Sequence, residues 1–160
     1  NLKNSLKYHE INYKHRGSKL IDDVAGLTTI DHEYAHAIDT RFALAKRPDL
    51  AAVVSKYATP QKIGILEVRE INAFNKELHG ADELLSNIVY NKLKARYGMN
   101  NIDFHKKVVE ELGTYAGSDK MEFLAEGFAN ARWLENPSLF VQDFKQIFDD
   151  EFNKVFGDGK

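Results

Sequence analysis

The sequence predicts an α+β fold that is mostly helical, with a small sheet packed beside an early helix. Three observations lead to this prediction. From about residue 28 onward, most of the chain repeats apolar residues at helical spacing. Residues 1–25 instead mix aromatic, β-branched and polar residues, as in Tyr8–His15, before the turn signal Arg16-Gly17-Ser18. With 160 residues and 43% hydrophobic content, the chain is long enough for one domain with a real core and too short to predict two.

Seven helices are predicted in order along the chain. The first five occupy about residues 28–46, 49–58, 64–79, 81–97 and 102–112. Prolines and glycines separate them, as at Pro48, which disfavours helix at the residue before it, and at Gly80. A sixth helix follows a glycine-rich loop and is predicted to be capped by Ser118 or Asp119.

The last helix is predicted to begin at Pro137, because proline suits the first helical position after an Asn136 cap. It carries a stripe of apolar residues at helical spacing, formed by Phe140, Phe144, Ile147, Phe148, Phe152 and Phe156. Such a stripe predicts core packing, with a partner-binding face as the alternative.

Composition excludes several classes of function. The formal net charge of −2 gives no basic signal for nucleic acid or for an anionic membrane surface. No apolar run approaches the roughly 18 residues that span a bilayer. Without cysteine, a metal site must use histidine and carboxylate ligands. The absence of cysteine and of a starting Met is compatible with a secreted mature form or an excised domain.

The most informative stretch is Thr28–Asp39, which contains H-E-x-x-H at His32, Glu33 and His36. Residues four apart in a helix lie on one face, so both imidazoles can bind one zinc ion. Glu33 then lies beside the metal, where it can accept a proton from bound water. Apolar neighbours predict that this helix packs on the core, where each unpartnered polar group costs about 1–3 kcal/mol. The alternative is a polar cluster satisfied without metal.

A second stretch supplies two carboxylates, Glu122 and Glu126, which lie four residues apart on a largely apolar helix. One carboxylate oxygen added to two histidines gives three protein ligands and an open fourth position, as in catalytic zinc sites. The alternative is an acidic surface stripe.

Asp39 lies three residues beyond His36, on the same side of the helix. It can accept a hydrogen bond from the outer nitrogen of a ligating histidine. It is less suited as a third ligand, because it lies about 10 Å along the helix axis from His32. A solvated helical aspartate is the other interpretation. His9 and His15, in the predicted strand, are interpreted as surface or capping groups rather than ligands.

A longer pattern resembles a known family. H-E-Y-A-H-A-I-D at residues 32–39 is followed by Tyr115, seven residues before Glu122, and by E-F-L-A-E-G-F-A at residues 122–129. This pattern is similar to the catalytic domain of anthrax lethal factor and its relatives, including the Pro-Pro endopeptidases. These are zinc metalloproteases of the gluzincin kind, with a zincin-like fold in which a small sheet lies beside the HExxH helix.

The resemblance implies a role for each matching residue. The zinc ligands are His32, His36 and Glu122, and Glu33 is the general base. Tyr115 takes the place of the tyrosine that supports the oxyanion, and Glu126 that of a carboxylate behind the ligands. The motifs cover about thirty residues, and the rest of the chain is not aligned with the family.

One departure from the family concerns spacing. Glu122 follows His36 by 86 positions, about twice the separation that we associate with those relatives. We therefore expect a helical insertion at about 60–112 within a single domain spanning 1–160, which can reshape or cover the cleft. Similar motif pairs also occur in phage-associated and polymorphic-toxin proteins, so a place in such a larger protein is one expectation for this chain.

The predicted function is a zinc-dependent endopeptidase that hydrolyses a peptide or protein substrate, with Zn²⁺ as cofactor and neither nucleic acid nor membrane as partner. The alternative is a non-catalytic metal-binding or adaptor module of a phage or polymorphic-toxin protein. Glu33 argues against the alternative, because zinc binding alone does not require a glutamate between the histidines. A third interpretation has no metal, with Glu122 and Glu126 in salt bridges.

Overall fold

The computed structural model describes residues 25–57 and 64–157, which form a set of helices joined by loops and turns. The elements in chain order are α2 (Ala25–Lys46), α3 (Pro48–Tyr57), α4 (Ile65–His79), α5 (Leu85–Tyr97), α6 (Asn101–Leu112), α7 (Lys120–Trp133) and α8 (Leu139–Phe156). The predicted helix positions are confirmed to within a few residues at each end.

The predicted α+β class is wrong. Residues 25–57 and 64–157 contain no β-strand and no sheet, so this part of the chain is all-helical. The strand predicted within residues 1–25, with His9 and His15, falls almost entirely outside the described residues. In the described part, helices provide the neighbours of α2, and its most extensive contact is with α7. In this part of the chain a helix, α7, therefore lies beside α2 where the prediction placed a small sheet.

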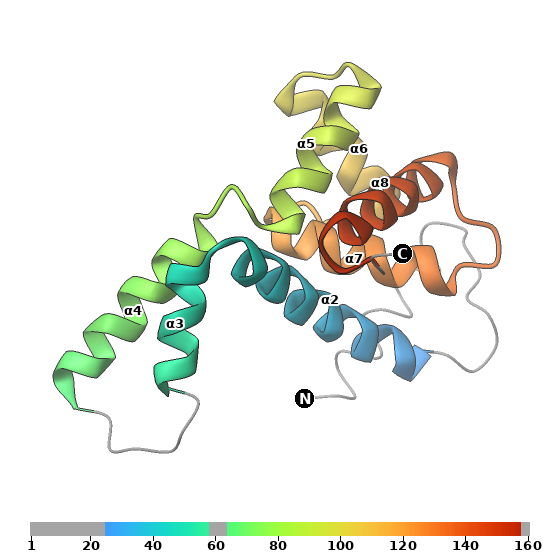
Figure 1. Ribbon diagram of the computed structural model, residues 1–160. Helices are drawn as coiled ribbons and strands as arrows, with labels where there is room; N and C mark the ends of the chain where they lie inside the picture. Colours follow the sequence, from blue (N-terminus) through green and yellow to red (C-terminus); the bar gives the residue numbers. More distant parts are fainter. Residues whose placement is uncertain (1–24, 58–63, 158–160) are drawn as a thin grey trace.

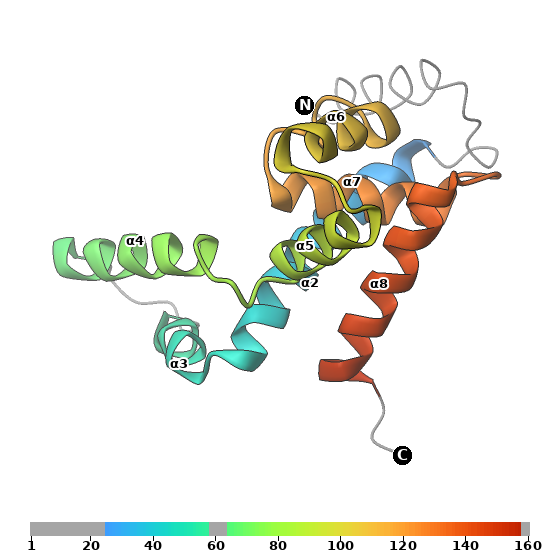
Figure 2. The same cartoon turned by 90° about the horizontal axis from the view of Figure 1, so that it is seen from above.

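Helix α7 is central to the fold. It contacts α2, α5, α6 and α8, and α5 also packs along α8 (Figures 1 and 2). Small residues lie where these helices pack: Ala125 and Ala129 of α7 and Ala35 of α2 are fully buried. Short side chains let neighbouring helices approach closely. The structure thereby brings α2 and α7, far apart in the sequence, into the same layer.

The main core is rich in aromatic and branched apolar residues. Its fully or nearly fully buried members include Phe42, Leu85, Val89, Leu93, Phe104, Val108, Leu112, Phe123, Leu124, Phe140, Val141, Phe144, Ile147 and Phe148. The apolar stripe predicted on the last helix is confirmed as core packing, since Phe152 and Phe156 also pack partly buried against this cluster. The predicted cap is wrong, because Ser138 rather than Asn136 caps α8 and accepts from the N–H of Val141.

Helices α3 and α4 project from the rest of the molecule as a pair (Figures 1 and 2). They join the body at a small second apolar cluster that includes Leu50, Leu78 and Leu84. The rest of the predicted insertion at about 60–112 is integrated differently, since α5 and α6 contribute Leu85 and Phe104 to the main core.

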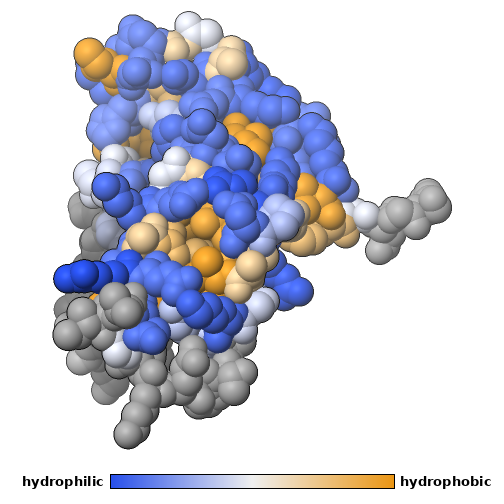
Figure 3. Space-filling view, turned by 60° about the vertical axis from the view of Figure 1, so that its left-hand side comes forward, coloured by the Kyte–Doolittle hydropathy of each residue, from blue (hydrophilic) through white to orange (hydrophobic). Residues whose placement is uncertain are grey.

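The surface on the side of α3 and α4 is mostly hydrophilic, with separate apolar patches between the charged side chains (Figure 3). Val54 of α3 and Val68 of α4 are among the exposed large apolar residues. None of the described helices has both the length and the apolar character that crossing a bilayer demands.

Candidate metal centre

Two histidines project from one face of α2, one turn apart. The Nε2 atoms of His32 and His36 lie 3.3 Å apart, and the two rings meet edge to face. The H-E-x-x-H spacing accounts for this geometry, because a helix places residues four apart above one another. His32 is buried against α7, whereas His36 is partly open to solvent.

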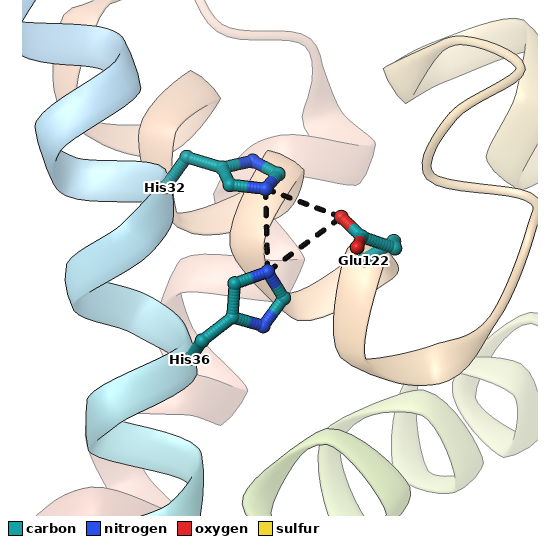
Figure 4. A group of neighbouring side chains, drawn as sticks. All are labelled: His32, His36 and Glu122. Carbon is teal, nitrogen blue, oxygen red and sulfur yellow. Dashed lines mark hydrogen bonds and ion pairs between the residues drawn. The ribbon is translucent and has the colours of Figure 1, made fainter.

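Glu122 reaches the same point from α7. Its Oε2 atom lies 3.1 Å from His32 Nε2 and 3.6 Å from His36 Nε2 (Figure 4). The first turn of α7 is held in place by Asp119, whose carboxylate accepts the N–H groups of Met121 and Glu122. The cap predicted from the sequence at Ser118 or Asp119 is therefore Asp119. The cap fixes the turn from which the third donor projects.

The donor set fits a metal ion. One ligand atom from each of His32, His36 and Glu122 lies within 4.8 Å of the others. Glu122 Oε2 is buried, and within the described residues its polar neighbours are the two imidazole nitrogens, with no further hydrogen-bond donor found for it. A buried carboxylate oxygen without a donor is costly, and a cation shared with two imidazole nitrogens removes that cost. Two histidine nitrogens and one carboxylate oxygen are the ligands of many catalytic zinc sites.

Tyr115 lies at the edge of this group. Its hydroxyl donates a hydrogen bond to Glu122 Oε1 at 3.1 Å, and its ring stacks on the imidazole of His32. Burial, followed by the charge and hydrogen bonding of Glu122, raises the pKa of Tyr115 to about 12. The phenol is therefore protonated at neutral pH and available as a hydrogen-bond donor, and the side chain remains 41% exposed.

Glu126 lies behind His32, one turn beyond Glu122 on α7. Its Oε1 atom is 3.2 Å from His32 Nδ1, the ring nitrogen that points away from Glu122. Glu126 is only 1% exposed, so this contact is shielded from water. Burial lowers the pKa of His32, but Glu126 and then Glu122 raise it more, and the pKa of His32 lies above its ordinary value.

Glu33 lies on the exposed side of α2, next to His32 in the sequence. Its charge acts electrostatically on both His32 and Tyr115, so its carboxylate is near the centre. It is not one of the three clustered ligands. This position leaves its carboxylate open to solvent.

Asp39 does not join the cluster of ligands. It is fully buried, and its Oδ1 atom accepts the backbone N–H of Ser86 at 2.9 Å. Burial raises the pKa of Asp39, against the opposing effect of its hydrogen bonds with Ser86. Asp39 therefore ties the α2 turn after His36 to the start of α5. Sequence reasoning missed Ser86, because nothing in the local pattern marks it as a partner of Asp39.

Asp31 is a second contact that sequence reasoning missed. It directly precedes His32, and its Oδ2 atom accepts a hydrogen bond from the indole of Trp133 at the end of α7. Arg132 also pairs with this oxygen, with a distance of 3.3 Å from its Nε atom. These contacts hold α2 and α7 together beside the histidines. The lone tryptophan close after E-F-L-A-E was the one available signal.

Comparisons with protein-family models, with curated proteins and with solved structures return no match.

Proposed function

We propose that this protein is a zinc-dependent endopeptidase in which His32, His36 and Glu122 hold the metal. The observation that carries the proposal is the convergence of two Nε2 atoms with the buried carboxylate oxygen of Glu122. The glutamate inside H-E-x-x-H and the tyrosine beside the third ligand favour catalysis over metal storage.

When bound, zinc supplies a Lewis acid that makes water more acidic and polarises a peptide carbonyl. Glu33 acts as general base, because its exposed carboxylate can remove a proton from the attacking water and return it to the leaving amine. Tyr115 supports the oxyanion, because its neutral hydroxyl can donate a hydrogen bond to the negative oxygen as the carbonyl is attacked.

Two buried carboxylates position the ligands. Glu126 lies 3.2 Å from His32 Nδ1 through its Oε1 atom, and its negative charge favours a proton on Nδ1, which leaves the lone pair of Nε2 for the centre. Asp39 holds the turn after His36 through its contact with Ser86. Neither group touches the substrate in this mechanism. Glu126 limits the rotation of the His32 imidazole, whereas Asp39 acts on the helix backbone that follows His36.

The test combines metal analysis with peptide cleavage. We expect freshly purified protein to contain about one zinc per chain, and a peptide library to be cleaved in the absence of chelator but not in its presence. Glu33→Gln should retain zinc and lose hydrolysis, since only the proton acceptor is removed. The matched control is Glu110→Gln, an exposed change on α6.

Three outcomes contradict parts of the proposal. Zinc without cleavage would indicate a non-catalytic metal-binding module. If the purified protein contains no zinc and a chelator changes none of its measured properties, the centre is a polar cluster without a metal. Full activity of Glu33→Gln would remove the general-base assignment while leaving the metal site intact.

A further inference from the structure

A cavity of about 210 Å³ lies where α5, α6 and the loop before α7 meet. This volume is well above the roughly 10–15 Å³ that a cavity needs to hold one water molecule, so a small ligand fits. Tyr90 of α5 and His105 of α6 line it, as do Ser118, Asp119 and Lys120 from the loop and the start of α7. None of the three clustered metal ligands is among the described residues of this wall, so the cavity is distinct from the candidate centre.

Lys120 brings a positive charge to this cavity. Its ammonium lies over the ring of Tyr90, 5.3 Å from the ring centroid, and both residues line the cavity. Within the described part of the chain, the Lys120 side chain forms no ion pair and no hydrogen bond. The cation–π contact holds the side chain and leaves the N–H groups of the ammonium for a ligand.

His105 brings a second donor from another direction. Its ring lies against the loop before α7, because a Cβ atom placed on Gly117 would lie 3.1 Å from the Cε1 atom of His105. Cε1 is bonded to both ring nitrogens, so the nitrogens lie beside the loop too. Among the described residues, no hydrogen bond or ion pair engages this imidazole, which donates one N–H when neutral and two when protonated. Lys120 and His105 thus offer donors from α7 and α6 to the same cavity.

The remaining polar groups of the wall are engaged or uncharged. The Ser118 hydroxyl donates to the carbonyl of Tyr115 at 2.7 Å. Asp119 is the one acid among the described residues of the wall, and its Oδ1 atom accepts two N–H groups at the start of α7, whose positive end offsets its charge. Burial raises the pKa of Tyr90, so this phenol is uncharged at neutral pH. Lys120 therefore carries the charge that a ligand meets, and the ligand that matches it is an anion.

Hydrogen bonds join this wall to two residues of the candidate centre. The N–H and the Oγ atom of Ser118 both donate to the carbonyl of Tyr115, at 3.0 and 2.7 Å. Asp119 accepts the backbone N–H of Glu122 at 2.9 Å. A ligand bound between α6 and this loop therefore stabilises the turn that carries Tyr115 and the first turn of the helix that carries Glu122.

We propose that this cavity binds a phosphate group through Lys120 and His105, and that its occupancy stabilises the turn that carries Tyr115. A phosphate group carries about −1.5 to −2 charges at pH 7 and three acceptor oxygens that point in different directions, which suits donors from two helices. A carboxylate has a single charge and two oxygens in one plane. Binding of phosphate does not depend on the proposed endopeptidase function, whereas the effect on cleavage rests on it.

An NMR titration tests the binding. Zinc-free protein, kept in chelator so that phosphate cannot bind through zinc, is titrated at constant ionic strength with inorganic phosphate, glycerol 3-phosphate and acetate. We expect both phosphates to shift the backbone amide signals of Gly117, Ser118 and Lys120, and acetate to require about tenfold higher concentration. The phosphate that binds more tightly identifies the free ion or a monoester as the source of the group. Absence of these shifts, or equal binding of acetate, overturns the site.

Substitutions decide whether the two named residues are responsible. Lys120→Gln removes the charge and should weaken phosphate binding by about tenfold, the loss of one charge-assisted hydrogen bond. His105→Ala should weaken it by about threefold to tenfold, the loss of a neutral or charged donor. Lys106→Gln is the matched control, because it makes the same change of charge next to His105 but outside the cavity wall. Thermal melting establishes that each variant is folded. Equal affinity of the wild type and Lys120→Gln overturns the site.

Peptide cleavage by the zinc-loaded protein tests the link to Tyr115. We expect inorganic phosphate to raise the cleavage rate of the wild type by about fivefold relative to that of Lys120→Gln, the lower end of typical coupling between two sites. A direct effect of phosphate on zinc is common to both proteins and cancels in this ratio. Equal responses overturn the link to Tyr115 and leave the endopeptidase proposal standing. If no peptide is cleaved, the endopeptidase proposal fails, and the NMR titration alone decides the phosphate site.

Discussion

Two of the clustered side chains, Glu122 and His32, are oriented by further contacts around the candidate centre. The carboxylate of Asp119 accepts the backbone N–H of Glu122, and the Tyr115 hydroxyl donates to Oε1 of the Glu122 carboxylate. The other oxygen is thereby turned toward the two imidazoles. At the opposite side of His32, Glu126 fixes the outer ring nitrogen. The centre is therefore largely preorganised, which favours binding of a metal with a defined geometry.

Tyr115→Phe tests the proposed role of the Tyr115 hydroxyl in stabilising the oxyanion. The change removes one hydroxyl and leaves the ring stacked on His32, so zinc content should be unchanged. Turnover should fall by about 100-fold or more, as when one oxyanion donor is removed from other hydrolases. Peptide cleavage and metal content are measured on the same preparation. Tyr97→Phe, which removes a hydroxyl bound to Asp143 away from the centre, serves as control. Equal turnover of the two variants would exclude the proposed role of Tyr115.

The clustering of His32, His36 and Glu122 was predictable from the sequence, and so was the place of Glu126 behind them, whereas the partners of Asp39 and Asp31 were not. Periodicity of the helix places His32 and His36 on one face, and the family pattern supplied Glu122 as their partner. The contact of Asp39 with Ser86 joins residues 47 positions apart, and that of Asp31 with Trp133 joins residues 102 apart. Such pairings depend on how helices pack, which local spacing does not encode.

At the scale of the element, α7 depends on one close approach to α8. A Cβ atom at Gly127 would lie 2.5 Å from the ring of Phe144, well inside van der Waals contact. Glycine is otherwise unfavourable in a helix, by about 1 kcal/mol relative to alanine. Its presence here is explained by the space that the phenylalanine ring requires.

Gly127→Ala is therefore expected to destabilise the protein despite the better helix propensity of alanine. Overpacking a core costs about 1–3 kcal/mol. Most of this range exceeds the gain of about 1 kcal/mol that alanine brings through its better helix propensity. Urea unfolding measures the change. In the double variant with Phe144→Leu, which makes room for the methyl group, the loss should be smaller than the sum of the single changes. Strict additivity would show that the two residues do not compete for space.

Glu151 of α8 gives a pH-dependent prediction. Burial raises the pKa of its carboxyl, but hydrogen bonds from Lys154 and Lys92 outweigh burial, and the pKa lies below its ordinary value. A carboxyl whose pKa is lower in the folded than in the unfolded state stabilises the fold above the unfolded value of about 4.3. This contribution is lost as pH falls through the folded pKa.

Glu151→Gln should thus reduce the free energy of unfolding by about 1–2 kcal/mol at pH 7 and by less below about pH 4. Urea unfolding of the wild type and the variant at both pH values measures the difference. Glu135→Gln, an exposed change outside the helices, should have no comparable effect. A difference between wild type and Glu151→Gln that is independent of pH would contradict the assigned charge interaction.

At the scale of the whole molecule, helix positions were predictable and the fold class was not. Proline and glycine breaks and apolar spacing located each helix, since these signals are local. The prediction of a sheet came from residues 1–25 and from the family pattern, and neither states what covers α2. In the described part, α7 packs along α2, and its buried Glu126 lies against His32. The same buried Glu126 that helps to orient His32 therefore belongs to an all-helical interface.

Zinc should stabilise the whole fold, because its ligands come from two helices that must pack together. With zinc at about 100 times its dissociation constant, we expect the melting temperature to rise by roughly 5–10 °C. Calorimetry of the protein with and without zinc measures the shift. His36→Ala should abolish the shift, since it removes the more exposed ligand with little loss of core packing. A shift that persists in this variant would place the stabilising metal elsewhere.

The pairing of α2 with α7 has a consequence for the newly made chain. A ribosome delivers the two histidines early and the glutamate much later, after α3 to α6 have been synthesised. Until then, no third donor exists to complete the centre. Under the proposed endopeptidase function, nascent chains and products truncated before α7 would carry the H-E-x-x-H motif without its third donor, and we expect them to be inactive toward the growing polypeptide and its neighbours.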